Sequence, residues 1–129
     1  KQYIAGNTND IYTDRQLRLM ISLPDGKIAG IVDVFDFDVR NSKAEVGIVV
    51  LREFRGRGIG RNALRLMEEH CFDFLGIHQI YAYVRCDNEA ALNVFRSCGF
   101  TETAVLKSWI RRGQKYYDVC MFQKFAEPQ

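Results

Sequence analysis

Apolar and polar residues alternate through the first third of the chain in the way that is typical of half-buried β-strands. Between residues 15 and 23, leucine or isoleucine occupies every second position, which predicts one strand. The segment Pro24–Lys27 is a strong turn signal, and residues 28–38 are the expected returning strand. A further turn over residues 40–43 leads into an apolar run that ends at Leu51. We therefore expect three antiparallel strands joined as a meander.

The middle of the chain changes to a helical period. From about Gly58 to Leu75, apolar residues recur at spacings of three and four, and Gly76 stands where the helix should end; these inward positions are Ile59, Ala63, Met67, Cys71 and Phe74 or Leu75. Residues 79–86 alternate again as a strand. Strand, helix and strand in this order form a βαβ unit, so residues 44–51 and 79–86 should be parallel neighbours.

The last third predicts a short helix and a hairpin. Asp87 or Asn88 caps the helix, which turns Ala91, Phe95 and Cys98 inward and ends at Gly99. Two β-rich segments, residues 103–111 and 115–123, then flank a turn. The expected fold class is α/β (α+β): a mixed, mostly antiparallel sheet with a central parallel strand pair flanked by helices, and a closing β-hairpin. Residues 1–129 form one domain, in which residues 1–14 carry little pattern and are expected to be helix or loop.

Composition narrows the functional classes. The chain has 129 residues, 47% hydrophobic and 26% charged, with a net charge of +2, which gives no case for binding nucleic acid or a membrane. The four cysteines and two histidines lack metal-site spacing, so we expect no metal, reduced thiols and a cytoplasmic protein.

The segment Arg55-Gly56-Arg57-Gly58-Ile59-Gly60 carries the candidate chemistry. Its glycines free the backbone N–H groups to point at one ligand, and the following helix adds its positive N-terminal end. Together they form an anion cradle suited to phosphate or pyrophosphate. The spacing fits neither a nucleotide P-loop, because no Lys-Ser/Thr pair follows Gly60, nor a dinucleotide fingerprint, because Arg61 stands where the third glycine belongs.

Two motifs together resemble one family. Arg55, Gly58 and Gly60 match [Q/R]-x-x-G-x-[G/A], the acetyl-CoA signature of the GNAT acetyltransferase superfamily. About thirty residues later, Asn88–Phe100 is similar to its second signature, N-x-x-A-x-x-x-[Y/F]-x-x-x-G-F. The segments Phe72–Tyr81 and Asp87–Ala91, with the closing hairpin, resemble the branch of bacterial diamine and spermidine N-acetyltransferases and ribosomal-protein N-terminal acetyltransferases.

The resemblance implies a site for acetyl-CoA as co-substrate. The glycine segment would hold the pyrophosphate, and the free edge of the preceding strand would pair with the pantetheine arm. One backbone N–H near Val49 or Val50 would face the thioester oxygen as an oxyanion donor. Asn88 would contact the CoA arm, cap its helix, or do both. The implied cofactor-binding residues are Ile48, Val49, Val50, Arg55, Gly56, Arg57, Gly58, Ile59, Gly60, Arg61 and Asn88.

The resemblance also implies catalytic roles. Glu45, at the start of the central strand, matches the carboxylate that takes the proton from the attacking ammonium; the alternative is a cross-strand partner of Lys27 or Lys43. Phe95 replaces the tyrosine that protonates the departing thiolate in many relatives. Asp33, Asp36 and Glu45 are the candidate binding residues for a cationic acceptor, and the aspartates, with Asp38, could instead be strand-edge charges.

The resulting interpretation is an N-acetyltransferase that acts by direct attack of a primary amine, a di- or polyamine being the first candidate. The alternatives are a protein N-terminal acetyltransferase of the ribosomal-protein type and a non-catalytic acyl-CoA-binding module. A homo-oligomer is left open. Relatives begin with a strand and helices that wall the acceptor side; this segment is expected to be absent from the sequence, either because the chain is a fragment, which we favour, or because the pocket is built differently.

Overall fold

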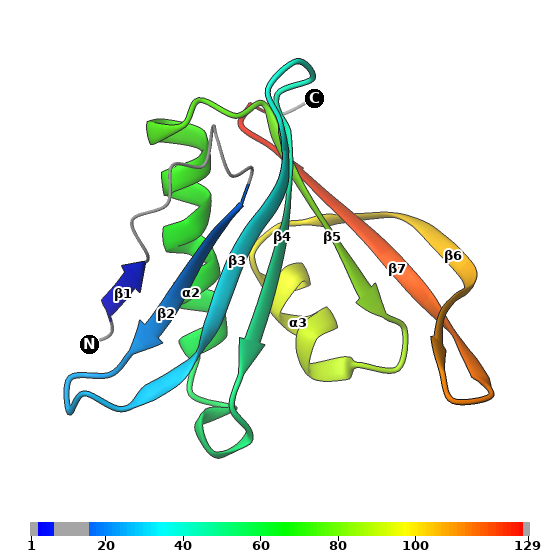
Figure 1. The fold of residues 1–129 in the computed structure, drawn as a ribbon, viewed down its shortest axis with the longest axis horizontal. Coiled ribbons are helices and arrows are strands. Elements are labelled where there is room, and N and C mark those ends of the chain that lie inside the picture. Colours follow the sequence, from blue (N-terminus) through cyan, green and yellow to red (C-terminus); the bar gives the residue numbers. More distant parts are fainter. Residues whose placement is uncertain (1–2, 7–15, 128–129) are drawn as a thin grey trace.

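The computed structural model describes residues 3–6 and 16–127. Seven strands form one sheet in the order β1-β2-β3-β4-β5-β7-β6 (Figure 1). Strands β2 (Leu17–Ser22), β3 (Ile28–Asp38) and β4 (Lys43–Val50) pair antiparallel, which confirms the predicted meander. Leu17 and Ile21 are buried whereas Arg18 and Met20 are exposed, as their alternation predicts.

The N-terminal expectation was wrong in one place. Residues Tyr3–Gly6 form a strand, β1, that pairs antiparallel with β2 at the edge of the sheet. A four-residue edge strand has too few positions to show a period, and its partner decides its conformation. Residues 7–15 lie outside the described part of the chain, so the rest of the helix-or-loop prediction falls on residues that the structure does not describe.

The predicted βαβ unit is present. A short 3₁₀ turn, η1 (Arg52–Phe54), precedes helix α2 (Ile59–Glu69), which continues into a π-helical turn, η2 (His70–Phe74), and then into β5 (Gln79–Arg85). The wider π turn shifts the helical phase at its end, so Cys71 is still buried but Phe74 is 78% exposed. Of the two residues predicted for this inward position, the half-buried Leu75 occupies it and Phe74 does not.

The parallel pair is short. Strands β4 and β5 pair only through Lys43–Gln79, Ala44–Ile80 and Glu45–Tyr81. Beyond this point β4 follows β3 while β5 follows β7, and the two strands diverge (Figure 1). The sheet therefore opens in its middle, on the side where both strands end.

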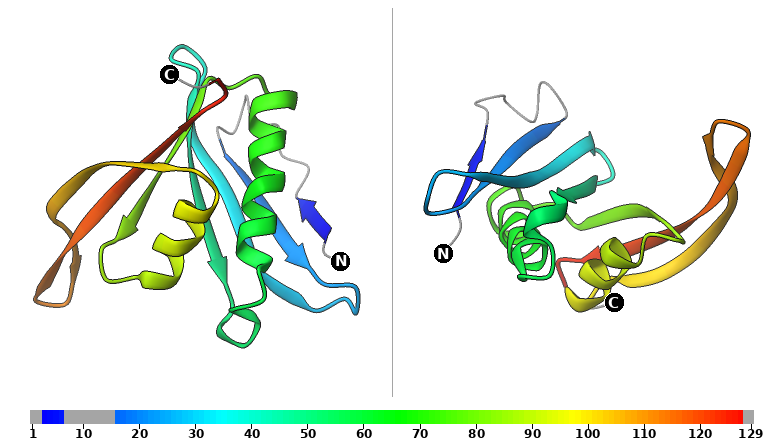
Figure 2. Two further views of the ribbon diagram at one scale, coloured as in Figure 1. Left: turned by 180° about the vertical axis from the view of Figure 1, so that it is seen from behind. Right: turned by 90° about the horizontal axis from the view of Figure 1, so that it is seen from below.

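Helix α3 (Glu89–Ser97) and helix α2 cover the same face of the sheet (Figure 2). The core lies between them and the sheet, with Val46, Leu64, Met67, Ile80 and Phe122 among its fully buried side chains. The chain closes with a hairpin of β6 (Thr101–Arg112) and β7 (Lys115–Phe125), longer than predicted at both outer ends. Figure 2 shows this hairpin curving away from the helices.

Candidate functional site

The gap between β4 and β5 exposes backbone groups of β4. The Leu51 N–H donates to the Ala29 carbonyl oxygen at 2.8 Å, so residue 51 points toward β3. Backbone groups alternate in direction along a strand, which turns Val49 toward β3 and Ile48 and Val50 toward the gap. The Arg55 Nε–H accordingly reaches the Val50 carbonyl oxygen at 3.0 Å from the other side. Of the three predicted backbone contacts, Ile48 and Val50 face the gap, and Val49 does not.

The glycine segment lies at the open end of this gap, just beyond the end of β4. Gly56 and Gly58 have φ angles of +80° and +75°, a conformation that side chains disfavour. The first helical bond of α2 runs from the Asn62 N–H to the Gly58 carbonyl oxygen at 3.1 Å. The N–H groups before Asn62 therefore sit at the positive end of the helix, where they suit an anion.

Gly60 has a role that its sequence context does not reveal. It is buried at the first turn of α2, and a Cβ atom there would lie 3.2 Å from Val50 Cγ2 and 3.5 Å from Val94 Cγ2. The absence of a side chain thus lets α2 approach both β4 and α3. Gly60 positions the cradle by close packing in addition to any ligand contact.

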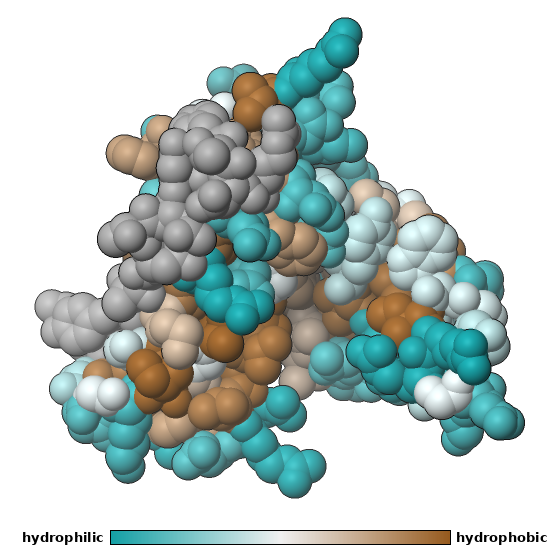
Figure 3. Space-filling model, viewed as in Figure 1, coloured by the Kyte–Doolittle hydropathy of each residue, from teal (hydrophilic) through white to brown (hydrophobic). Residues whose placement is uncertain are grey.

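A cavity of about 180 Å³ joins the gap to the glycine segment. It is lined by Ile48, Val49, Val50, Arg55, Gly58, Gly60, Asn88, Ala90, Ala91 and Val94. Figure 3 shows apolar surface gathered where the two halves of the sheet separate. The lining brings most of the predicted cofactor-binding residues together, although they come from three elements.

Four predicted residues lie outside this lining. Gly56 is exposed in the turn, Ile59 is buried in the core, and Arg61 is exposed. The Arg57 guanidinium lies over the Phe54 ring, 5.5 Å from its centroid. Conversely, the predicted cofactor-binding set lacked Ala90, Ala91 and Val94, although three-residue steps along the helix from Asn88 lead to Ala91 and Val94.

Asn88 has one demonstrated role and lines the cavity as well. Its Oδ1 accepts a hydrogen bond from the Ala91 N–H at 3.2 Å and so caps α3. Of the two capping candidates, Asn88 is the cap, while Asp87 forms an ion pair with Arg85 at 2.8 Å. The cap holds the N-terminus of α3 against the open end of the gap.

Glu45 lies at the point where β4 and β5 separate. Its register partners are Phe35 on β3 and Tyr81 on β5, and its side chain is half-buried. Burial, with a smaller contribution from the Asp36 carboxylate, raises the pKa of Glu45 to about 7. The alternative was that Glu45 pairs with Lys27 or Lys43 across the strands. The described contacts do not support this pairing, because Lys27 lies 4.0 Å from Asp25 and Lys43 lies over the Tyr81 ring.

The three aspartates of β3 have different surroundings. Asp36 sits in a register irregularity of β3 with φ of +52°, exposed and close enough to raise the pKa of Glu45. Asp33 instead pairs with Arg18 through an oxygen–nitrogen distance of 2.8 Å. Asp38 accepts hydrogen bonds from Asn41 that lower its pKa and close a turn. A cationic acceptor would therefore meet Asp36 and Glu45, whereas the charge of Asp33 is compensated.

Asp36 and Glu45 form an acidic face, and two tyrosines extend it. The sequence analysis did not assign these tyrosines to the acceptor site. The rings of Tyr81 and Tyr83 lie in an edge-to-face arrangement with centroids 5.9 Å apart. Burial, followed by the charges of Glu45 and Asp36, raises the pKa of Tyr81 to about 12. Beside Asp36, a hollow of about 520 Å³ extends along β2 and β3. Carboxylates and aromatic faces together are a surface that suits an organic cation.

Phe95 belongs to the core. It is 2% exposed, and its ring contacts those of Phe100 and Phe122 at centroid distances of 5.0 and 5.7 Å. The position of the second motif that would hold a tyrosine hydroxyl thus carries only hydrocarbon. Tyr116 and Tyr117 lie by Cys86 rather than by Glu45.

The site fits acetyl-CoA on three counts: the glycine cradle, the free edge of β4 and the apolar cavity between them. Within residues 16–127, no group of three or more histidine, cysteine or acidic side chains is arranged to hold a metal ion. In the same part of the chain, every helix is too short or too polar to cross a membrane.

Comparison with known proteins agrees with this geometry. A sequence profile of the Acetyltransferase (GNAT) family matches residues 3–100. The spermidine N(1)-acetyltransferase of Escherichia coli K12 is 27% identical over 113 residues, which cover 85% of this chain and 61% of that protein. The putative ribosomal N-acetyltransferase YdaF of Bacillus subtilis is 26% identical over 100 residues, covering 78% of this chain and 55% of that protein. The chain thus spans about three fifths of these relatives or less.

Solved structures show the same fold. A chimera of the spermidine N-acetyltransferase SpeG from Vibrio cholerae and hSSAT superposes with a TM-score of 0.84 at 23% identity, covering 90% of this chain and 70% of that one.

Proposed function

Because the chain belongs to the acetyltransferase (GNAT) family, we propose that it transfers the acetyl group of acetyl-CoA to a primary amine by direct attack. The observation that carries the proposal is Glu45, a half-buried carboxyl whose pKa is raised to about 7, placed where β4 and β5 separate. A base with this pKa is half ionised at neutral pH, close to the working range of a general base that takes a proton from an ammonium.

The co-substrate would lie in the gap. The N–H groups of the glycine segment would hold its pyrophosphate, and the gap-facing backbone of Ile48 and Val50 would pair with its pantetheine arm. Ala91 and Val94 line the cavity and would cover the pantetheine arm from the side of α3. Bound there, acetyl-CoA supplies a thioester carbonyl as the electrophile.

The residues around Glu45 then account for the chemistry. Glu45 removes a proton from the acceptor ammonium, directly or through a water, and frees the nitrogen lone pair for attack. Of the two β4 residues expected to supply an oxyanion donor, only Val50 has its N–H toward the gap, and we assign it this role. The leaving thiolate needs little assistance, because a thiol has a pKa of about 8.5. A chain with Phe95 at the acid position can therefore still catalyse.

A di- or polyamine is the acceptor class that the open face favours. Asp36 and Glu45 supply negative charge, and Tyr81 and Tyr83 supply aromatic faces. The relative from Escherichia coli is named for spermidine, which combines primary amines with further cationic groups. A second ammonium of the acceptor would lie near Asp36 while the first approaches Glu45.

The test is release of CoA, followed with a thiol reagent. Spermidine and putrescine are compared with a monoamine, an amino-acid amide and a peptide with a free N-terminus. We expect turnover with the polyamines that Glu45→Gln lowers by about 10²-fold or more while acetyl-CoA affinity, measured by titration calorimetry, stays the same.

The other outcomes are distinct. Preference for the peptide would move a protein N-terminus ahead of polyamines as the acceptor. Acetyl-CoA binding without turnover of any amine would overturn catalysis and leave an acyl-CoA-binding module.

A further inference from the structure

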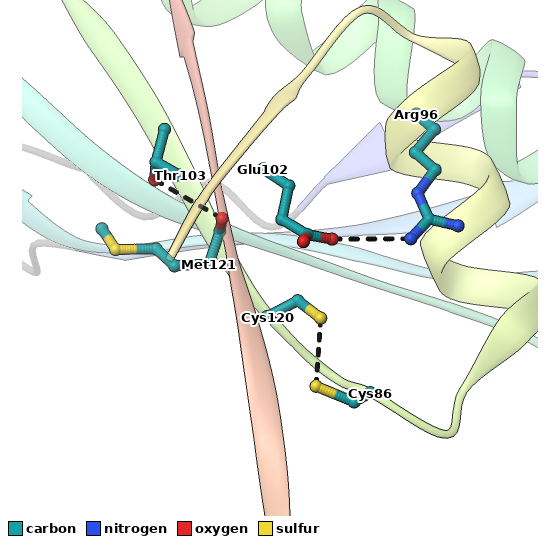
Figure 4. Close-up of polar contacts among 6 residues, drawn as sticks. All are labelled: Cys86, Arg96, Glu102, Thr103, Cys120 and Met121. Atoms are coloured by element: carbon teal, nitrogen blue, oxygen red, sulfur yellow. Dashed lines mark hydrogen bonds and ion pairs between the residues drawn. The ribbon is translucent and has the colours of Figure 1, made fainter. Parts of the chain in front are cut away.

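Two thiols face each other at the junction of β5 and β7. The Sγ atoms of Cys86 and Cys120 lie 3.0 Å apart (Figure 4). Cys86 directly follows β5, and its N–H donates to the Asp118 carbonyl oxygen at 3.0 Å, which ties it to the strand that carries Cys120. Both cysteines are free thiols. A disulfide has a sulfur–sulfur distance of about 2.0 Å, so an approach of about 1 Å would join them.

Access to the pair is one-sided. Cys86 is half-buried and borders a hollow of about 320 Å³ together with Asp87, Tyr116, Tyr117 and Asp118. Cys120 is only 5% exposed. A small reagent in the hollow would therefore meet Cys86 first, with Cys120 behind it.

The buried thiol has a raised pKa. Burial raises the pKa of Cys120 to about 12, and both Cys86 and the Glu102 carboxylate contribute to the increase. Glu102 on β6 is held by Arg96 of α3, with a nitrogen–oxygen distance of 3.4 Å (Figure 4). A raised pKa keeps Cys120 protonated, so Cys120 is the second thiol to react and not the first.

We propose that Cys86 and Cys120 form a reversible oxidation site whose oxidant is a low-molecular-weight disulfide of the glutathione type. The site is separate from the proposed acetyl transfer and does not depend on it. Cys71 and Cys98, by contrast, are buried singly in the core, and the Cys98 thiol lies 3.6 Å from the Arg61 carbonyl oxygen.

The reaction proceeds by two exchanges. The Cys86 thiolate attacks one sulfur of glutathione disulfide, forms a mixed disulfide and releases one glutathione thiolate, which takes up the proton lost by Cys86. Cys120 then loses its proton to solvent and attacks the Cys86 sulfur. The Cys86–Cys120 bond forms, and the second glutathione thiolate leaves and takes up a proton from solvent. Two protein thiols are oxidised, and one glutathione disulfide is reduced to two glutathiones.

The full chain can be tested without mutation. Reduced protein is treated with glutathione disulfide, and the product is examined by intact mass and by a non-reducing peptide map. We expect a mass lower by two hydrogen atoms, a linked pair of peptides containing Cys86 and Cys120, and recovery of both thiols with dithiothreitol. A stable glutathione adduct on the unmutated chain, a bond to Cys71 or Cys98, or four unreacted thiols would each overturn the proposal.

Two variants test the order of events. Cys120→Ala should retain one glutathione on Cys86, because the second exchange is lost, whereas Cys86→Ala should gain none. Cys71→Ala is the matched control and should still form the disulfide. Circular dichroism checks that each variant is folded. A glutathione retained by Cys86→Ala and not by Cys120→Ala would contradict Cys86 as the entry point.

Discussion

The Lys124 ammonium forms an ion pair with the Glu68 carboxylate on the helix-covered face of the sheet, joining β7 to α2. The Glu68 side chain is 8% exposed and that of Lys124 is 30% exposed, so the contact lies largely inside the protein. Lys124 also donates to the Cys98 carbonyl oxygen at 2.5 Å, at the end of α3. One side chain therefore connects both helices to the second half of the sheet.

Removing this lysine should destabilise the fold. Lys124→Met leaves the Glu68 carboxylate and the Cys98 carbonyl without their partner, and we expect a loss of about 2–4 kcal/mol in the free energy of unfolding. Lys27→Met is the control, since Lys27 is exposed and 4.0 Å from Asp25, and should change stability by less than about 0.5 kcal/mol. Urea denaturation measures both.

The double variant Glu68→Gln/Lys124→Met should recover part of the loss, because no carboxylate is then buried alone. Equal stabilities for Lys124→Met and Lys27→Met would show that the buried pair contributes nothing.

The rate of acetyl transfer should follow the ionisation of Glu45. A base must be deprotonated, so kcat at saturating acceptor should fall as pH drops through about 7. Replacing Glu45 with glutamine should remove this acidic limb together with most of the rate. Retention of the limb in the variant would assign it to another group.

Ionisation of Glu45 should also change the stability of the fold. The rate should rise with pH, whereas this contribution to stability should fall. The folded-state pKa of Glu45 is raised from 4.5 to about 7, so the folded protein holds a proton that the unfolded chain loses. This contribution to stability is fully present below about pH 4.5 and is lost as pH rises through about 7. Urea midpoints at several pH values, compared between the native chain and Glu45→Gln, measure the difference. Parallel profiles for the two proteins would contradict the shift.

The cradle can be tested with two glycines of the same conformation. Gly58 and Gly26 have φ angles of +75° and +86°, and an added Cβ would meet open space at Gly26 and only the Arg61 side chain, at 3.7 Å, at Gly58. Valine at either position should cost a similar amount of stability, about 1–2 kcal/mol. Only Gly58→Val should weaken CoA binding, by about tenfold or more, because only Gly58 borders the cavity. Unchanged affinity of Gly58→Val for CoA, measured by titration calorimetry, would contradict the glycine segment as the pyrophosphate site.

This pair is a cleaner test than Gly60→Val. A side chain at Gly60 would press against Val50 and Val94 and disturb the packing of α2 itself.

Restoring a hydroxyl at Phe95 should increase the rate. Phe95→Tyr would return an acid to the second motif, and we expect kcat to rise about threefold to tenfold with little change in KM for acetyl-CoA. Phe100→Tyr, in the same aromatic cluster, is the control and should give no increase. No gain from Phe95→Tyr, combined with a large loss of kcat in Tyr81→Phe, would place the acid at Tyr81, next to Glu45 in the sheet.

The acidic face should distinguish acceptors by their charge. Asp36→Asn should raise KM for spermidine by about threefold to tenfold and leave KM for a monoamine nearly unchanged, since only the longer acceptor reaches Asp36. The difference should shrink in high salt, which screens exposed charges over about 8–10 Å. Asp33→Asn is the matched control, because Arg18 already compensates Asp33. Equal effects of both substitutions would point away from a specific role of Asp36.

The local sequence pattern was sufficient to predict many elements of this protein and much of its cavity lining. The alternation of residues 15–23, the turn at Pro24–Lys27 and the helical period after Gly58 each depend on neighbours in the sequence, and the structure agrees with them. The two motifs around Gly58 and Asn88 likewise predicted the cavity lining, because a glycine turn and a helix cap are local features.

Tertiary structure decided the rest, because register and burial involve residues far apart in the chain. The resemblance made Glu45 a candidate base, but its raised pKa comes from burial next to β5 and from the Asp36 carboxylate, which only the tertiary structure brings about. The phase of the β3–β4 ladder decides that Val50, rather than Val49, faces the gap. Cys86 and Cys120 are 34 residues apart in the sequence, and only the pairing of β5 with β7 brings their sulfur atoms together.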